Sequence, residues 1–232
     1  MVYGELGRHP LEIEIQVRMV SFWSKLISND NKLSSIMYKI LHKLHINGTY
    51  HFKWVSYIKS IFDKCGISYI WDNQIPVNGK YLKTHVKQLL RDQFFQLWHN
   101  DIVNSSRGEF YSIFKTEFGL ANYLLKLSPS ERIEICRIRT SNLRIPIESG
   151  RWYGIQRSDR LCNLCDCEQL GDEYHYLYIC KNPNIIRLRH MFIPAYCYRH
   201  PNVEKMKGHL YFCNIKVLKN LSRFIRNLKK LF

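Results

Sequence analysis

Apolar residues recur three or four positions apart along most of the 232-residue chain. This spacing places them on one face of a helix, and it is clear in residues 11–28, 32–46, 52–64 and 79–103. The steps Asn47-Gly48 and Gly66 separate the earlier segments. In the first segment, the stripe expected to be buried consists of Ile15, Met19, Phe22, Trp23, Leu26 and Ile27. In residues 79–103 it consists of Leu82, Val86, Leu89, Leu90, Phe94, Leu97 and Trp98.

The second half of the chain continues in shorter segments. Residues 110–118 and 120–127 predict two short helices. Ser128 and Glu131 then form the pattern of a capping box with proline at the first helical position, so a helix should begin there and run to about Asn142. Residues 67–76 are short, rich in β-favouring residues and end at a proline, which predicts a loop or a short strand.

The last helix-like segment, residues 216–232, differs from the others in charge. Its apolar residues are again three or four apart, but Lys and Arg accompany them and no Asp or Glu does. The pattern predicts an amphipathic helix with an apolar stripe packed on the protein and a solvated basic face. Binding of this helix to a membrane surface is the second interpretation.

Four of the eight cysteines cluster in the stretch RLCNLCDCEQLGDEYHYLYICKNP, residues 160–183. The spacing Cys162-x2-Cys165-x9-His175-x4-Cys180 offers three thiolates and one imidazole. A closed set of four such ligands suits one structural zinc ion per chain. Because four protein ligands leave no open position for water, we do not expect catalysis at this metal.

Other interpretations of the cysteines remain open. The cluster could bind no metal, or it could be a redox Cys-x-x-Cys, although no βαβ pattern surrounds it. Cys167 is a spare thiol that could replace Cys165 in a looser knuckle. A second set of four could also bind a metal, although its flanks are loose and basic; it consists of Cys197, His200, His209 and Cys213.

Together these patterns predict a mainly α fold, a helical bundle with a small Cys-Cys-His-Cys zinc-knuckle-like insert and a basic C-terminal helix. We expect three regions. Residues 1–145 would form a helical region, residues 146–190 the zinc-binding module and residues 191–232 a basic helical tail.

The net charge points toward a polyanionic partner. Lys and Arg number 35 against 19 Asp and Glu, a formal charge of +16, and the sequence pI is about 9.5. Residues 181–232 hold 12 of those cations and one of those acids. A protein this basic usually meets nucleic acid, although some basic proteins have no such partner.

Arginines also flank the cysteine cluster, and aromatic residues lie among them. Arginine neutralises phosphates, and an exposed aromatic ring can stack on an unpaired base. The candidate nucleic-acid contacts are Arg137, Arg139, Arg144, Arg151, Trp152, Arg157, Arg160, Arg187 and Arg189. Tyr174, Tyr176 and Tyr178 could either stack on bases or cover the metal module, so Trp152 is the preferred stacking residue.

Two further expectations concern the surroundings of the protein. No segment reaches the roughly 20 apolar residues of a membrane span, and residues 1–16 lack the apolar stretch of a signal peptide. Clustered cysteines favour a reducing intracellular compartment over a disulfide scaffold, with nucleus and cytoplasm not distinguished.

Three quoted stretches give a specific resemblance. They are GELGRHPLEIEIQVRMVSFWSKL, LRDQFFQLWHNDI and RIRTSNLRIPIESGRWYGIQRSDRLCNLCDCEQLGDEYHYLYICKNPNIIRLR. These stretches resemble the region that follows the catalytic core of reverse transcriptases from LINE-like (non-LTR) retrotransposons. The resemblance covers nearly the whole chain, and its most diagnostic part lies between Ile147 and Cys180.

The resemblance implies a Cys-Cys-His-Cys zinc motif behind the polymerase thumb, associated with holding template RNA and target DNA. Its ligands fall on the same four residues that spacing selects. The chain lacks the Asp-Asp turn that such polymerases use to hold magnesium, so we expect a non-catalytic fragment that binds the backbone of RNA or DNA, single-stranded or hybrid. The alternative is a structural or protein-interaction module that associates with itself through exposed apolar helix faces.

Overall fold

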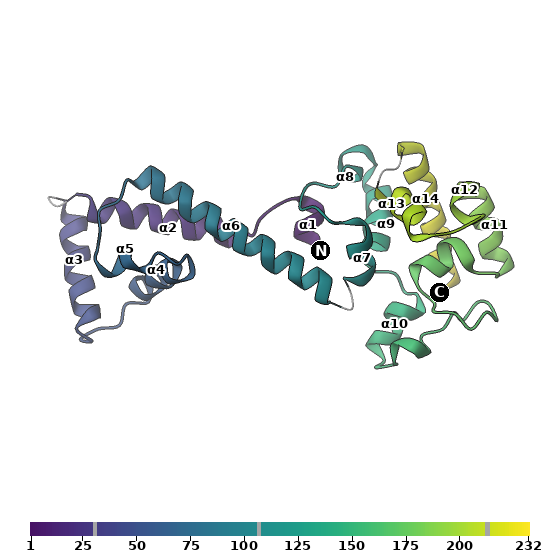
Figure 1. Cartoon of the computed structure of the whole chain (residues 1–232), viewed down its shortest axis with the longest axis horizontal. Helices are drawn as coiled ribbons and strands as arrows, with labels where there is room; N and C mark the ends of the chain where they lie inside the picture. Colours follow the sequence, from purple (N-terminus) through teal and green to yellow (C-terminus); the bar gives the residue numbers. More distant parts are fainter. Residues whose placement is uncertain (30–31, 106–107, 212–213) are drawn as a thin grey trace. The chain divides into compact units, whose positions relative to one another are not determined.

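The structure, a computed structural model, describes residues 1–29, 32–105, 108–211 and 214–232. Helices connected by short loops make up the described chain (Figure 1). Within these ranges β-structure is limited to two isolated bridges, Leu6 with Leu120 and Leu161 with Leu170. The predicted mainly α fold is therefore confirmed.

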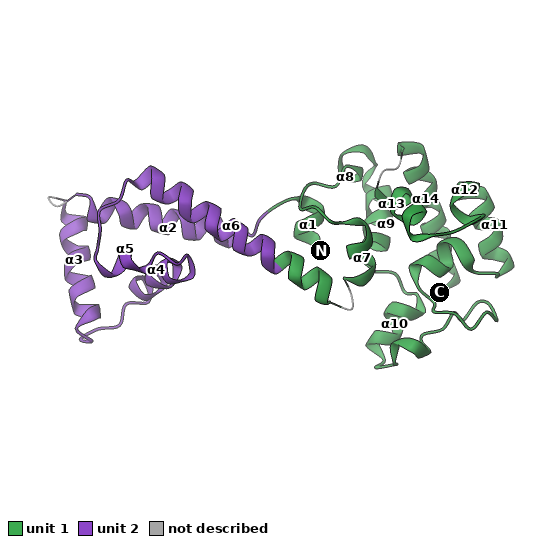
Figure 2. Cartoon of the chain, viewed as in Figure 1, with its two compact units in different colours: residues 1–8, 98–232 green, residues 9–97 purple. Residues whose placement is uncertain are grey.

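The chain divides into two compact units (Figure 2). Unit 1 contains residues 1–8 and 98–232, and unit 2 contains residues 9–97. The divisions predicted at residues 145 and 190 both fall inside unit 1. The sequence pattern did not indicate that residues 1–8 belong with the distant C-terminal part of the chain.

Unit 2 is built from α2 to α5 and most of α6. The bounds are α2 Leu11–Ile27, α3 Leu33–Ile46, α4 Lys53–Lys64, α5 Ser68–Asp72 and α6 Gly79–Asn104. Its core centres on the fully buried Trp23, whose ring lies 4.7 Å from that of Phe62 and 5.6 Å from that of Trp71. The Trp23 indole nitrogen donates a 2.8 Å hydrogen bond to the Tyr38 hydroxyl, so the polar atom of this core ring is satisfied.

Several sequence predictions in unit 2 are wrong. On α6, Leu97 was expected in the buried stripe but is 59% exposed. The buried face of α2 contains Ile13, Val17 and Val20, whereas Ile15 and Phe22, both predicted to be buried, are about half exposed. This helix carries apolar residues on two faces, and spacing alone does not say which face has a partner. Residues 68–72 form helix α5 instead of a loop or strand, because Ile70 and Trp71 bury against the other helices.

Unit 1 contains the remaining elements, most of them short. The helices are α1 Val2–Leu6, α7 Glu109–Phe114, α8 Tyr123–Lys126, α9 Pro129–Arg139, α10 Pro146–Trp152, α11 Pro183–Phe192, α12 Ala195–Tyr198, α13 Val203–Tyr211 and α14 Ile215–Leu228. The 3₁₀ segments are Arg157–Asp159 and Lys229–Leu231, and His175–Ile179 is a π-helix. The predicted capping box opens α9: Ser128 donates to the Glu131 carboxylate from its backbone at 2.9 Å and its hydroxyl at 2.8 Å.

Helix α14 forms the centre of unit 1, where it packs against α9 and α11. Its apolar stripe is buried as predicted, with Leu221, Phe224 and Ile225 inaccessible to solvent. A helix of mixed composition is held by burying such a stripe, and each fully buried side chain contributes about 1.5–3 kcal/mol.

A buried ion pair joins α1 to α9. The Arg139 guanidinium donates to both carboxylate oxygens of Glu5, at 3.0 Å and 2.9 Å, and to the Leu210 carbonyl at 2.7 Å. It also lies 4.4 Å from the ring centre of Phe114. Burial raises the pKa of Glu5, but the hydrogen bonds and charge of Arg139 outweigh it and hold the pKa below its ordinary value.

Candidate metal centre and basic surface

The four predicted metal ligands come together in unit 1. One ligand atom from each of Cys162, Cys165, His175 and Cys180 lies within 4.8 Å of all the others. The Cys162 sulfur is 3.6 Å from that of Cys165 and 3.9 Å from that of Cys180. The Cys165 sulfur is 3.3 Å from His175 Nε2. The described chain thus contains a Cys/His group that could hold a metal ion.

These separations can be compared with those of a tetrahedral site. With zinc–sulfur bonds of about 2.3 Å and zinc–nitrogen bonds of about 2.0–2.1 Å, tetrahedral angles put two sulfurs about 3.8 Å apart and sulfur and nitrogen about 3.6 Å apart. The three measured distances lie within about 0.3 Å of these values. These three distances are compatible with a donor set that could hold one four-coordinate ion.

A short antiparallel contact presents the first two cysteines. The Cys162 N–H donates to the Gln169 carbonyl at 2.8 Å, next to the bridge between Leu161 and Leu170. Inside the turn, the Leu164 N–H points at the Cys162 sulfur, 3.4 Å away. This contact fixes the position of the Cys162 sulfur inside the turn.

The second pair of ligands depends on the π-helix His175–Ile179. The Cys180 N–H donates to the His175 carbonyl at 2.8 Å, which closes a turn from residue i to residue i+5. In an α-helix the neighbours on one face are three or four residues apart, so residues five apart diverge. The wider turn brings His175 and Cys180 to the same side, within the four-residue group that could hold a metal ion. Asp172 begins the segment by accepting the His175 N–H at 2.7 Å.

The imidazole of His175 is oriented from its other side. His175 Nδ1 lies 3.3 Å from the side-chain oxygen of Gln169, which leaves Nε2 to face the cysteine sulfurs. Metal-binding histidines commonly make such a contact through the second ring nitrogen, which fixes the ring and its tautomer.

Arg189 supports the π-helix and is not a surface residue. Only 5% of it is exposed, and its guanidinium donates to the carbonyls of Leu177, Tyr176 and Cys180 at 2.9, 3.3 and 3.1 Å. These are carbonyls that the irregular turn leaves without helical partners. Its proposed role as a nucleic-acid contact is therefore corrected to one in holding the metal ligands.

The protonation of the thiols differs across the site. Burial alone would raise the pKa of Cys165, but backbone N–H groups of Lys181 and Cys167 bring it down to about 7. Burial raises the pKa of Cys180 to about 12. A bound cation must therefore displace a proton from Cys180, since thiolates are the ligands.

The other cysteines that the structure describes take no part in this group. Cys167 is partly exposed and lies outside the four-ligand cluster. In the second candidate set, Cys213 lies outside the described residues. Cys197 is buried, and the buried His209 is hydrogen-bonded through Nδ1 to the Tyr178 hydroxyl at 2.8 Å.

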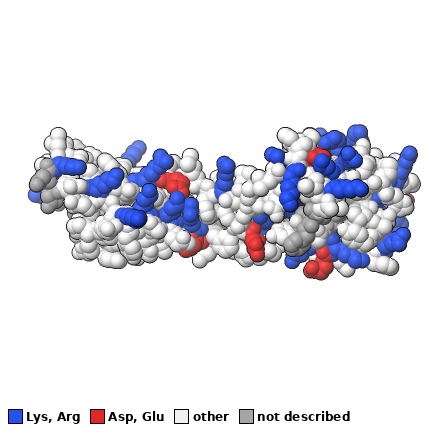
Figure 3. Space-filling model, turned by 90° about the horizontal axis from the view of Figure 1, so that it is seen from above, with Lys and Arg blue, Asp and Glu red and all other residues white. Residues whose placement is uncertain are grey.

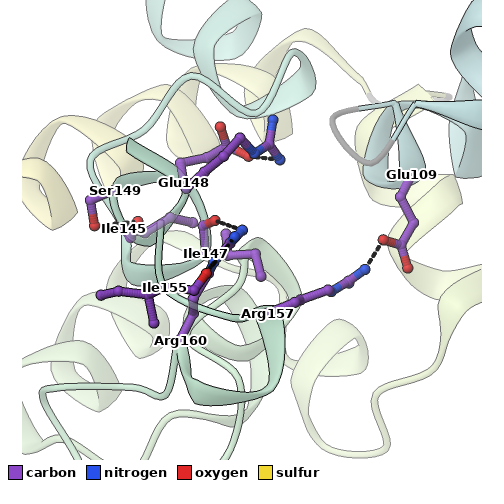
Figure 4. Close-up of polar contacts among 9 residues, drawn as sticks. Glu109, Ile145, Ile147, Glu148, Ser149, Ile155, Arg157 and Arg160 are labelled. Atoms are coloured by element: carbon purple, nitrogen blue, oxygen red, sulfur yellow. Dashed lines mark hydrogen bonds and ion pairs between the residues drawn. The ribbon is translucent and has the colours of Figure 1, made fainter. Parts of the chain in front are cut away.

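Several predicted arginine contacts are engaged within the protein (Figure 4). Arg160 donates to the carbonyls of Ile155 and Ile147, so its guanidinium is used in holding the loop before the cysteines. Arg151 pairs with Glu148 at 3.0 Å, and Arg157 pairs with Glu109 while both side chains remain about half exposed.

Arg139 is likewise not a surface contact for nucleic acid. Only 2% of it is exposed, and its guanidinium donates to Glu5 and to the Leu210 carbonyl. Sequence patterns do not reveal this pairing, since the acidic partner of Arg139 lies 134 positions away. Sequence spacing on α9 alone makes Arg137 and Arg139 look equivalent.

The remaining candidates are accessible. Arg137 is partly exposed and pairs with Glu134 at 3.3 Å. Arg144 and Arg187 are exposed, and neither makes a hydrogen bond or ion pair within the described chain. Trp152 is 57% exposed. Tyr176 and Tyr178 are buried against the metal module, so they cover it and do not present a stacking surface.

A row of cations on α14 and the turn after it was not among the predicted contacts. It consists of Lys216, Lys219, Arg223, Arg226 and Lys230, all exposed and spaced three or four residues apart. We call this set the α14 basic row. Figure 3 shows that Lys and Arg greatly outnumber Asp and Glu on the face of unit 1 that it draws. The spacing of the cations in residues 216–230 was a signal sufficient to find the row.

Comparison with known proteins adds no assignment. No family model, no curated protein and no solved structure matches the chain. Among the described residues, no helix is both long enough and apolar enough to span a membrane.

Proposed function

We propose that the protein is a nucleic-acid-binding module whose unit 1 is stabilised by zinc and contacts the phosphate backbone of RNA or DNA. The observation that carries the proposal is the α14 basic row. Four of its five cations lie on one exposed face of α14, whose opposite face is buried in the core, and Lys230 continues the row in the 3₁₀ turn that follows. A rigid helix can therefore present them together to a row of phosphates.

The dimensions of the row suit a nucleic-acid strand. From Lys216 to Lys230 the row extends about 21 Å, a distance over which a strand presents several phosphates. Glu131 lies near Lys219 and Arg223, and its single negative charge is outnumbered by the five cations of the row. The net charge of this face is therefore positive.

The metal has a structural role in this proposal. Three cysteines and one histidine are a donor set typical of zinc, and a closed set leaves no position for a substrate or a reactive water. The ion would hold the cysteine turn and the π-helix together, and with them the adjoining start of α11, the helix that carries the exposed Arg187. The proposal contains no catalytic step.

The resemblance to the tail of LINE-like reverse transcriptases supports the same proposal. Its most diagnostic residues, IESGRW from Ile147 and the Cys-Cys-His-Cys spacing, lie in α10 and the candidate metal centre. We infer that the chain is related to such a tail and shares its nucleic-acid-binding role.

A salt titration tests the proposal. Affinity of the zinc-loaded chain for an unstructured RNA should fall steeply as salt rises, because each phosphate contact releases condensed counterions. Replacing Lys219, Arg223 and Arg226 together by Gln should reduce the slope of log affinity against log salt by about 2, at about 0.7 for each single-strand contact.

The matched control replaces three exposed cations of unit 2, Lys25, Lys53 and Lys83, by Gln and so removes the same charge. This control variant should keep most of the slope of log affinity against log salt. Binding that does not respond to salt, or an equal loss in both triple variants, would contradict a specific role for the α14 basic row.

A second candidate function rests on α3. Leu33, Ile36, Met37 and Ile40 follow each other at helical spacing, and between 45% and 74% of each is exposed. An apolar stripe of this kind is typical of a protein-interaction surface. Sedimentation of the chain with and without Met37→Glu tests it: a complex that the variant abolishes would favour this function.

A further inference from the structure

A groove in unit 1 lies between the end of α9, the loop after it, the end of α10 and the residues that follow α14. Its volume is about 460 Å³, and its polar and aromatic lining includes Arg137, Arg144, Trp152, Lys229 and Phe232. We propose that this groove holds one unpaired nucleotide, with the base against Trp152 and a phosphate at Arg144 and Arg137. This inference rests on the proposed function and adds to it the single-stranded character of the ligand.

The volume is suitable for such a ligand. Small-molecule sites in proteins usually occupy about 300–1,000 Å³, which includes the size of one nucleotide. All the lining residues belong to unit 1, so the groove is formed within one compact body.

The charge of the groove favours an anion. Lys229 Nζ contacts the two carboxylate oxygens of Glu134 at 2.8 Å and 2.9 Å, and Arg137 approaches the same carboxylate at 3.3 Å. One carboxylate thus lies against two cations, which leaves an excess positive charge. Arg144 adds a further cation that is exposed and makes no ion pair within the described residues.

Trp152 supplies the stacking surface. Its ring is 57% exposed and makes no ring contact in the described part of the chain, so one face is available to a base. Phe232 forms another part of the lining, but its ring already packs edge-on against Tyr176, with centres 5.2 Å apart. Trp152 is therefore the residue on which we place the base.

The groove also adjoins the α14 basic row. Lys230 ends the row, and its neighbour Lys229 lines the groove. A strand whose phosphates lie along the row can therefore place its next nucleotide in the groove. In a duplex the bases are paired and stacked inside the helix, so only an unpaired nucleotide can enter without disruption.

The test uses the full, zinc-loaded chain and three probes of one length: an unstructured oligo-uridine, the corresponding strand without bases, and a paired duplex. The strand with bases should bind at least about 5-fold, and up to about 150-fold, more tightly than the abasic strand, as expected for one stacked base. Trp152→Leu should abolish this difference, and Trp152→Phe should restore most of it.

Tyr153→Leu is the matched control, because Tyr153 is the next residue and is 78% exposed but does not line the groove. It should keep the preference for bases. Arg144→Gln should weaken binding of both single strands and lower the salt slope by about 0.7, as expected for loss of one phosphate contact.

The outcomes separate the two proposals. If no probe binds in a salt-dependent manner, the proposed function fails and the groove proposal fails with it. The groove proposal is overturned, while backbone binding stands, if the probes bind but the strand with bases binds no more tightly than the abasic strand. It is also overturned if Tyr153→Leu and Trp152→Leu reduce this preference for bases equally. Tryptophan emission that is quenched by oligo-uridine in the wild type and not in Trp152→Phe gives a second measurement that does not depend on the Leu variant.

Discussion

At the scale of single residues, burial fixes the protonation of His209. The side chain is 1% exposed, and Nδ1 is hydrogen-bonded to the Tyr178 hydroxyl at 2.8 Å. Burial lowers the pKa of His209 to about 4, from 6.5, because the charged form would lose its hydration. The folded protein therefore keeps this histidine neutral at pH values where the unfolded chain protonates it.

This residue should make stability depend on pH. Between pH 6.5 and about 4 the unfolded state binds more protons, so the free energy of unfolding should fall with falling pH, by up to about 3 kcal/mol in total. His209→Asn retains a polar atom near the Nδ1 position but does not titrate. Urea unfolding of both proteins at several pH values should give a flatter profile for the variant; parallel profiles would argue against the buried neutral state.

The four candidate ligands give a second residue-scale prediction. We expect about one zinc ion per chain by elemental analysis, lost in Cys162→Ala and in His175→Ala. Cys167→Ala is the matched control, since that thiol lies in the same segment but outside the four-ligand group. Retention of zinc in the first two variants, or its loss in the third, would show that the ligand set is assigned incorrectly.

At the scale of elements, the π-helix His175–Ile179 depends on Arg189. Arg189→Gln should lower the free energy of unfolding by about 2–4 kcal/mol, because buried carbonyls of Leu177, Tyr176 and Cys180 lose their donors. Metal affinity should fall with it. Arg187→Gln, two residues along the same helix and exposed, should change stability by less than about 0.5 kcal/mol in the same chemical denaturation.

The elements also show how far the sequence could predict the structure. The long stripes of apolar residues predicted the bounds of α2, α3, α4 and α6 to within a few residues. Cysteine and histidine spacing selected the four candidate metal ligands that lie together in the structure. Both signals are local in the sequence. The buried face of α2 and helix α5 depend on packing partners that lie far away in the sequence. The buried roles of Arg139 and Arg189 likewise follow from tertiary contacts, which an isolated arginine does not reveal.

At the scale of the whole molecule, residues 1–8 should matter for unit 1 and not for unit 2. Their removal takes Glu5 away and leaves the Arg139 guanidinium buried without its carboxylate, which costs about 3–5 kcal/mol. Hydrogen exchange of the shortened chain should show reduced protection in residues 98–232 and unchanged protection in residues 9–97. Uniform loss of protection across both units would contradict this division.

The return of the chain to unit 1 also affects the order in which the protein can fold during its synthesis. Unit 2 is a continuous stretch and can complete its core as soon as residue 97 has left the ribosome. Glu5 must meanwhile wait for Arg139, 134 positions later, which at translation rates of about 5–20 residues per second takes on the order of 10 s. During this interval residues 1–8 lack their partner and are accessible to chaperones and proteases. The Glu5–Arg139 ion pair therefore forms late in the synthesis and folding of the protein.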